Sequence, residues 1–329
     1  MLDKQYKNLT LRLGFALLLL LVLLQGLMTV LALGQLLFET LFVQKVADII
    51  YWSLYNLVYM LSFMLPVPFF MLISGKKQGE PICFRVHFPR YFALMVAAIV
   101  GLTLAAGQIN ALLLAPFAGE NSSTDMLLEM LSPDKGYMTV LVFIMIVIVP
   151  AFCEEFLFRG LVLGNLLPYG KGVAIVGSAL LFAAMHQNFG QFLYTAVAGI
   201  FLGMLYAESR SIWPSTVVHM LNNMLSFVQM MLYARIEDEL TASRVTLCVD
   251  LAVIGAGIVC AAVLMLLYKR TKKASMQQEG MFGRIDLPEP RCALSRGVAV
   301  RKFFSPTVIA FIVLSFLLAL GNLLLENML

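Results

Sequence analysis

The chain has 329 residues, of which 61% are hydrophobic and only 13% are charged. Soluble domains are about half apolar and about a quarter charged, so this composition excludes a water-soluble enzyme. The apolar residues form long unbroken runs, which excludes an outer-membrane barrel, whose strands alternate apolar and polar residues. The net charge of +4 comes without basic residues interleaved with aromatic ones, so no nucleic-acid partner is indicated. We therefore predict an all-α polytopic protein embedded in a lipid bilayer.

Nine apolar runs are candidate membrane helices, because a helix needs about 20 apolar residues to cross a bilayer. They lie at residues 13–37, 49–73, 91–114, 137–167, 173–187, 192–207, 214–233, 247–268 and 306–325. The first run is too long for the apolar part of a cleaved signal peptide, so we expect it to remain as an anchor. The fifth and sixth runs are short and are joined as in a tight hairpin. The sequence predicts a bundle of about eight to nine transmembrane helices.

We expect the chain to have three parts: N-terminal helices over 1–135, a core of the fourth to seventh apolar runs over 136–235, and C-terminal helices over 236–329 with a basic loop at 269–304. Lys and Arg concentrate on the cytoplasmic side of membrane proteins. If the N-terminus is cytoplasmic, most of the 23 Lys and Arg residues fall on that side, and the acidic loop at 120–134 falls on the other. We therefore predict a multi-pass protein of the cell membrane with a cytoplasmic N-terminus.

Three charges stand within the fourth apolar run, at Glu154, Glu155 and Arg159. Ionisable groups inside a bilayer are costly, so they mark a functional site by default. Residues four apart share a helix face, while adjacent residues point about 100° apart. Glu155 and Arg159 are therefore expected to pair, and Glu154 is expected to point elsewhere, into a cavity.

Two later apolar runs each carry a histidine, His186 and His219. Glu154 precedes the turn at 168–172 by about as many residues as His186 follows it, so the helix rise places both at a similar depth. His219 follows the next turn on the same side and reaches an overlapping depth. Phe182 shares a helix face with His186, and Asn223 shares one with His219. We predict that these side chains meet within the membrane.

The pattern E-E-x-x-x-R, then F-x-x-x-H, then H-x-x-x-N, across successive apolar runs, closely resembles the CPBP family of CAAX-processing and bacteriocin-processing intramembrane endopeptidases, related to the Rce1-type proteases. The resemblance covers residues 137–233, less than a third of the chain. It implies an intramembrane catalytic cavity and an endopeptidase that hydrolyses a peptide bond of a membrane-associated protein or peptide, in CAAX-type or bacteriocin processing.

The resemblance also implies a role for each residue. Glu154 would act as general base, with His186 orienting and polarising the attacking water. His219 and Asn223 would stabilise the oxyanion of the tetrahedral intermediate. Structural support would come from Glu155, Arg159 and Phe182.

A metal is an open question at this stage. Family members are commonly labelled metalloproteases, and Glu154, His186 and His219 would form a His₂Glu set, which suits catalytic zinc. No HExxH motif is present, and a ligating Glu154 would leave the reaction without a base. We favour a glutamate mechanism in which no cofactor is required, with zinc as the alternative.

Two other classes of function remain as alternatives. A non-catalytic bacteriocin-immunity or sensor scaffold would retain the protease fold, although the intact motif argues against it. A proton-coupled transporter would also use buried Glu and His. Against a transporter, we expect no charged residue in the other spans and find no repeated broken helices.

Overall fold

A computed structural model describes residues 2–75, 82, 84–115, 127–274 and 294–326, and within these residues the regular secondary structure is helical. The main helices are α1 (Leu2–Leu41), α2 (Gln44–Met64), α3 (Pro66–Ser74), α4 (Phe92–Leu114), α9 (Lys171–Met185), α10 (Phe189–Ser209), α11 (Ile212–Arg235), α12 (Glu239–Ala274), α13 (Arg296–Phe303) and α14 (Pro306–Glu326). Between α4 and α9 runs an irregular rod made of η2 (Pro133–Lys135), α6 (Thr139–Phe143), a π-helix (Ile144–Ile148), α7 (Val149–Glu155), a second π-helix (Phe156–Leu163), α8 (Gly164–Leu166) and η5 (Leu167–Tyr169).

Seven helical stretches of the described chain are long and apolar enough to cross a membrane, which confirms a polytopic membrane protein. They are Leu2–Leu41, Gln44–Ser74, Phe92–Leu114, Thr139–Tyr169, Phe189–Ser209, Glu239–Arg270 and Pro306–Leu325. The other two predicted segments are also helices. However, α9 has only 15 residues, and α11 is interrupted by polar side chains. The predicted eight to nine spans are thus an approximate count.

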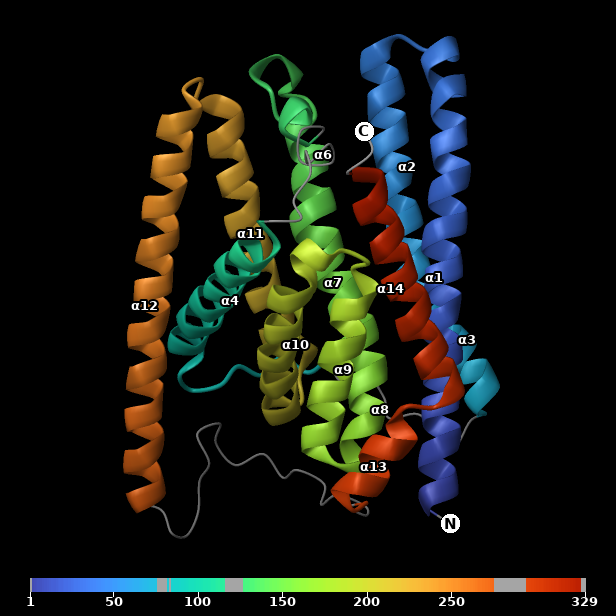
Figure 1. Ribbon diagram of the computed structural model, residues 1–329, viewed down its shortest axis with the longest axis vertical. Coiled ribbons are helices and arrows are strands. Elements are labelled where there is room, and N and C mark those ends of the chain that lie inside the picture. Colours follow the sequence, from blue (N-terminus) through green and yellow to red (C-terminus); the bar gives the residue numbers. More distant parts are fainter. Residues whose placement is uncertain (1, 76–81, 83, 116–126, 275–293, 327–329) are drawn as a thin grey trace.

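Figure 1 shows α1, α2 and α14 on one side of the molecule and α12 on the opposite side, resting on the tilted α4. Between them, α9 and α10 form a hairpin whose turn lies partway up the bundle rather than at its end. The hairpin is therefore re-entrant, and it presents the residues of its turn to the interior of the molecule.

Amide side chains from three helices hold the re-entrant turn in place. Asn110 of α4 donates to the carbonyl oxygen of Gly190 at 2.7 Å. Asn322 of α14 donates to the carbonyl oxygen of Gln187 at 3.1 Å. Gln25 of α1 donates to the side-chain oxygen of Gln187 at 2.7 Å, and Gln187 has a φ of +51°, which is uncommon for a residue with a Cβ. A turn inside a membrane needs such partners, because there is little water there to bond its backbone.

Glycine permits the closest helix approaches. A Cβ on Gly199 of α10 would lie 3.0 Å from the Cα of Ala179 in α9. A Cβ on Gly101 of α4 would lie 2.7 Å from the Cα of Gly257 in α12. Small residues let helix backbones touch and pack in a bilayer, where the hydrophobic effect does not drive helices together.

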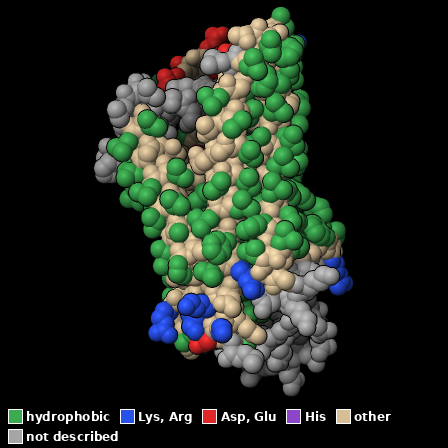
Figure 2. All heavy atoms as spheres, turned by 90° about the vertical axis from the view of Figure 1, so that its right-hand side faces the viewer, with side chains coloured by type: hydrophobic (Ala, Val, Ile, Leu, Met, Phe, Trp, Pro, Cys, Tyr) green, Lys and Arg blue, Asp and Glu red, His purple; other side chains and the backbone are tan. Residues whose placement is uncertain are grey.

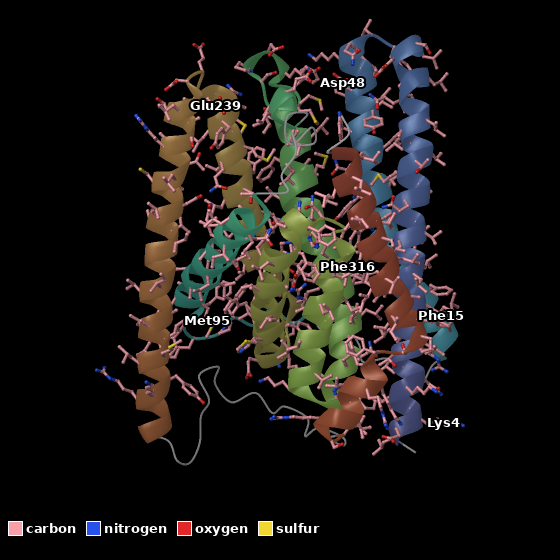
Figure 3. All side chains as sticks on the ribbon, viewed as in Figure 1. Lys4, Phe15, Asp48, Met95, Glu239 and Phe316 are labelled. Carbon is pink, nitrogen blue, oxygen red and sulfur yellow. The ribbon has the colours of Figure 1, made fainter. Side chains whose placement is uncertain are left out.

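Charge is distributed unevenly along the molecule. Lys4 lies at the end where the N-terminus is, and Asp48 and Glu239 lie at the opposite end (Figure 3). On the face in Figure 2, Lys and Arg side chains gather at the first end, acidic ones at the second, and hydrophobic side chains cover the surface between. The cytoplasmic location of the N-terminus stays a prediction, as does the three-part division of the chain. Residues 120–126 of the acidic loop and 275–293 of the basic loop lie outside the described residues.

One expectation about the other spans is wrong. Asp250 lies inside α12 and its side chain is buried. Gln108 of α4 donates to one of its carboxylate oxygens at 2.7 Å, and Gln229 of α11 donates to the other. Two amide donors stabilise a buried carboxylate because each hydrogen bond replaces one that water would make. Asp250 thus joins three helices.

Candidate active site

The rod that carries Glu154 departs from regular α-helix on both sides of that residue. π-Helical turns precede and follow α7, and such turns occur frequently at functional sites. Pro150, in the first turn of α7, has no N–H to bond the carbonyl of Ile146 four residues earlier. The side-chain amide of Asn223 in α11 donates to that carbonyl at 3.0 Å. Pro150 and Asn223 together therefore tie the rod to α11 next to Glu154.

Glu155 and Arg159 form an ion pair with 3.0 Å between Oε1 and Nη1, and both side chains are almost fully buried. The Nδ1 of His219 lies 3.1 Å from the same Oε1. Arg159 also donates to the carbonyl oxygen of Gly199 at 3.4 Å. The expected pairing of Glu155 with Arg159 is thus present, and Glu155 additionally orients His219.

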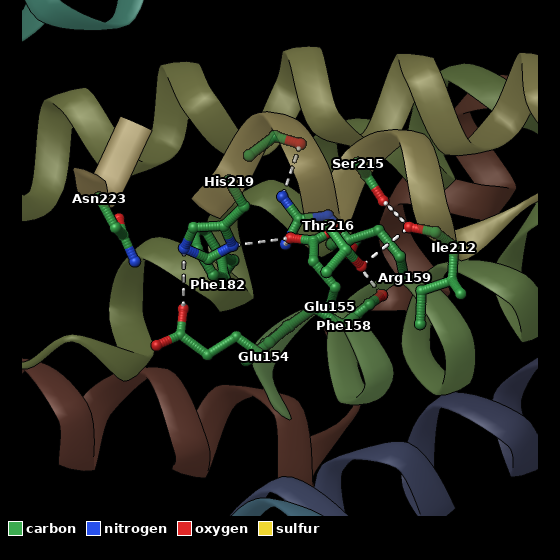
Figure 4. A network of polar contacts seen from close by, with 12 residues as sticks. Glu154, Glu155, Phe158, Arg159, Phe182, Ile212, Ser215, Thr216, His219 and Asn223 are labelled. Carbon is green, nitrogen blue, oxygen red and sulfur yellow. Dashed lines mark hydrogen bonds and ion pairs between the residues drawn. The ribbon is translucent and has the colours of Figure 1, made fainter. Parts of the chain in front are cut away.

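Glu154 points away from Glu155 and toward two imidazoles that come from other elements. Its Oε2 lies 3.9 Å from the Nε2 of His186, which caps the C-terminal end of α9. The same Oε2 lies 3.8 Å from the Nε2 of His219 in α11. Figure 4 shows the carboxylate of Glu154 directed at His219, with Glu155 on the other side of the imidazole. The structure therefore brings the three predicted side chains together.

The partners of the two imidazoles determine which ring nitrogen faces Glu154. The Nδ1 of His186 lies 2.8 Å from the carbonyl oxygen of Phe182, and a carbonyl only accepts, so Nδ1 carries the proton. The Nδ1 of His219 likewise donates to Glu155, so in both rings it is Nε2 that faces Glu154. The Oε2 of Glu154 has no hydrogen-bond partner among the described residues. The gaps of 3.8 and 3.9 Å are longer than a direct hydrogen bond, so neither imidazole bonds Glu154 directly.

Phe182 lies at the centre of the site. Its ring meets the ring of His186 edge to face, with centroids 4.9 Å apart, and the ring of His219 at 5.9 Å. The guanidinium of Arg159 lies 4.5 Å from the same ring centroid. Phe182 therefore packs against both imidazoles and the cation, which limits their rotation and excludes water from the ion pair.

A cavity of about 680 Å³ opens next to these groups. Glu154, His186, His219 and Asn223 line it, together with residues of α1, α2, α4 and α10. Apart from Glu154 and the two histidines, its described lining is apolar or neutral, with hydroxyl and amide side chains such as Gln191 and Asn222. A peptide segment has the same mixture of apolar and neutral hydrogen-bonding groups, so the cavity is suited to one.

The sequence analysis missed Tyr59 of α2, whose hydroxyl donates to the Oε1 of Glu154 at 2.5 Å. Tyr51, Tyr55 and Tyr59 recur every four residues, and this spacing places three hydroxyl-bearing rings on one helix face. That repeat is the signal that could have identified the residue, although nothing in it names Glu154 as the partner.

The suitability of the site for zinc can be judged from its spacing. Tetrahedral zinc holds its N and O ligands at about 2.0–2.2 Å, which places neighbouring donor atoms about 3.4 Å apart. Oε2 of Glu154 lies farther than this from both imidazole nitrogens, at 3.8 and 3.9 Å. In the part of the chain that the structure describes, no group of three or more His, Cys, Asp or Glu side chains is placed to hold a metal ion. These donor atoms thus lie wider apart than tetrahedral zinc requires, and both the metal-free mechanism and the zinc alternative stay predictions.

A protein-family model described as "Type II CAAX prenyl endopeptidase Rce1-like" matches residues 136–225. This range contains Glu154, Glu155, Arg159, His186 and His219 and ends just after Asn223. It excludes α2 with Tyr59, as well as α1, α12 and α14. No curated protein and no solved structure matches the chain.

Proposed function

We propose that this chain, whose residues 136–225 match the Rce1-like family of type II CAAX prenyl endopeptidases, hydrolyses a peptide bond of a membrane-associated protein or peptide inside its cavity. The family implies intramembrane CAAX-type protease activity. The observation that carries the proposal for this chain is the convergence of Glu154, His186 and His219 from three separate elements on one side of a membrane cavity.

In the proposed reaction a water molecule lies between the Oε2 of Glu154 and the Nε2 of His186. Glu154 takes a proton from the water, and the oxygen of the water attacks the carbonyl carbon of the scissile bond. The Nε2 of His186 accepts a hydrogen bond from the same water and so orients the lone pair of the water oxygen. Nε2 is free to accept because the ring proton of His186 is held at Nδ1 by the carbonyl of Phe182. Glu154 then returns the proton to the leaving nitrogen, so that the carboxylate is regenerated when the C–N bond breaks.

Two donors would stabilise the negative oxygen of the tetrahedral intermediate. His219 would donate from Nε2 to the oxyanion while its Nδ1 donates to Glu155, and a ring that donates from both nitrogens is an imidazolium. Asn223 uses one amide hydrogen for the carbonyl of Ile146 and keeps the second. Removing one such donor costs about 10²- to 10³-fold in turnover, so both side chains have a large expected effect.

The decisive test replaces Glu154 by Gln, which keeps the shape and removes the base. The full chain is purified in detergent, returned to liposomes and assayed with a fluorogenic peptide that ends in a farnesylated CAAX sequence. We expect the cleavage rate to fall at least 10³-fold while the thermal unfolding curve stays within a few degrees of the wild type. Glu129→Gln is the matched control, because Glu129 is an exposed glutamate paired with Lys135 outside the cavity.

Wild-type turnover by Glu154→Gln would refute the proposal. If neither the wild type nor Glu154→Gln cleaves the peptide, other substrates can be sought by mass spectrometry, which compares the membrane proteins of cells that contain one form or the other. An identical set of membrane peptides in both cells would support the non-catalytic scaffold instead.

A chelator series on the purified protein separates the glutamate mechanism from the zinc alternative. We expect full activity after treatment with 1,10-phenanthroline and dialysis, because the proposed reaction needs no metal. Loss of activity that added zinc restores would assign Glu154, His186 and His219 to a metal instead.

A further inference from the structure

The carboxylate of Glu154 has two oxygens with different surroundings. Oε2 faces the two imidazoles across gaps of 3.8 and 3.9 Å. Oε1 accepts a hydrogen bond from the hydroxyl of Tyr59 at 2.5 Å. Within the described chain, Tyr59 is the one side chain that donates a hydrogen bond directly to Glu154. The position of the proposed base therefore depends on a residue of α2.

The direction of the Tyr59 hydroxyl is set by packing. Its ring stacks on Phe63, with centroids 4.7 Å apart and planes inclined by 30°. Phe63 is fully buried in the core that α1, α3 and the Glu154 rod share. Holding a Tyr ring costs little conformational entropy, because the side chain has only two rotatable bonds before the hydroxyl. Tyr59 is thus a rigid donor aimed at a flexible glutamate.

Among the described residues, no other side chain of the site hydrogen-bonds Glu154. Arg159 is committed to Glu155, and the nearest nitrogens of His186 and His219 are too far from Glu154 for a direct hydrogen bond. Tyr55 and Tyr194 also line the cavity, but the hydrogen bond to Glu154 comes from Tyr59. A glutamate among apolar walls loses the water that would stabilise its charge. The short hydrogen bond from the phenol of Tyr59 replaces part of that solvation and fixes the direction in which Oε2 points.

We propose that Tyr59 is a positioning residue of this site: its hydroxyl holds the carboxylate of Glu154 rotated so that Oε2 is presented to the attacking water. The proposal rests on the proposed function in that it assigns Glu154 as the base. It adds that the site is built across α2 and the Rce1-like segment, because the matched residues 136–225 lack this donor.

The kinetic test compares Tyr59→Phe with Tyr51→Phe. The first keeps the ring that stacks on Phe63 and removes only the hydroxyl, and the second removes a hydroxyl two turns away on the same helix, outside the cavity. For Tyr59→Phe we expect kcat to fall about 10- to 100-fold with KM unchanged within about twofold, because the base is disturbed and the peptide contacts are not. The acidic limb of its pH–rate profile should move to higher pH by about one unit. Tyr51→Phe should match the wild type in kcat, in KM and in the acidic limb of the pH–rate profile.

A spectroscopic test needs no substrate and so stands apart from the cleavage assay. Infrared difference spectra recorded during a pH titration show the C=O band of a carboxylic acid, and the band that is missing in Glu154→Gln belongs to Glu154. We expect Tyr59→Phe to move the midpoint of that band to higher pH. 3-Fluorotyrosine in place of Tyr59 keeps the packing and is a stronger donor, so it should move the midpoint to lower pH.

The outcomes decide between the two proposals. If Tyr59→Phe leaves the midpoint of the Glu154 band unchanged or lowers it, the role of Tyr59 is overturned, whether or not the protein cleaves peptide. Midpoints that move as expected in a protein without protease activity support Tyr59 and reject the proposed function. If Tyr59→Phe does not fold, the fluorotyrosine protein alone gives the answer, because an unchanged midpoint there overturns the proposal as well.

Discussion

At the scale of single residues, the pair Glu155–Arg159 illustrates how a buried charge depends on its partner. Both side chains are almost fully buried, and the Oε1 of Glu155 also accepts from His219. Removing one member of a buried pair leaves the other charge without solvation or a counterion, at a cost of about 3–5 kcal/mol. We expect Arg159→Met to lower the free energy of unfolding by that amount, measured by titration with SDS in mixed micelles.

The matched control is the double variant Glu155→Gln/Arg159→Met. It removes both charges, so it should recover most of the stability lost in Arg159→Met. Activity should remain low in the double variant, because the neutral amide of Gln is a weaker acceptor for the Nδ1 proton of His219 than the carboxylate of Glu155. Equal stability of the single and double variants would show that the pair is not the source of the cost.

At the scale of the element, the re-entrant turn between α9 and α10 depends on amides that other helices supply. Asn110 donates to the carbonyl oxygens of Phe189 and Gly190, and its own oxygen accepts from the N–H of Leu193. We expect Asn110→Leu to speed hydrogen exchange of the backbone amides at 189–193 by about tenfold or more, because the three hydrogen bonds that hold the turn in place are lost. Mass spectrometry of deuterated peptides measures this rate.

Asn56→Leu is the control for that experiment. The side chain of Asn56 donates to the carbonyl of Trp52 within its own helix, so it ties no two elements together. It should leave exchange at 189–193 unchanged. The same rate in both variants would mean that Asn110 does not hold the turn, and that packing of Gly199 on Ala179 is enough to do so.

At the scale of the whole molecule, α12 is attached mainly through its contact with α4. Gly101 and Gly257 face each other so closely that a Cβ on either would meet backbone atoms of the partner helix at 2.7 Å. We expect Gly101→Ala to destabilise the protein by about 1–3 kcal/mol, because backbone cannot move aside as a side chain can. A lower thermal unfolding temperature in detergent would report this loss.

Gly255→Ala is the matched control, since it lies on α12 with no atom within 4 Å of the position of its Cβ. Alanine is the better helix former by about 1 kcal/mol, so this variant should unfold at the same or a higher temperature. If Gly255→Ala lowered the unfolding temperature as much as Gly101→Ala does, glycine would matter for the helix itself rather than for the contact between α4 and α12.

Local spacing and composition were enough to predict several features correctly. The apolar runs predicted a membrane helix bundle because hydropathy is a property of the segment alone. The pairing of Glu155 with Arg159 followed from the helical repeat, which links residues four apart regardless of the remaining fold. The same repeat placed Phe182 beside His186. Matching distances from shared turns placed Glu154, His186 and His219 at one depth.

Only the tertiary structure decided which side chains face one another across helices. Tyr59 is 95 residues from Glu154 in the chain, and the amides that hold the re-entrant turn come from α1, α4 and α14. Such contacts depend on how far each packed helix is rotated about its axis and shifted along it. Hydropathy is nearly the same for every rotation of an apolar helix in a bilayer, so local sequence predicts a membrane helix bundle and the residues that share a helix face, whereas the partners across helices follow from packing.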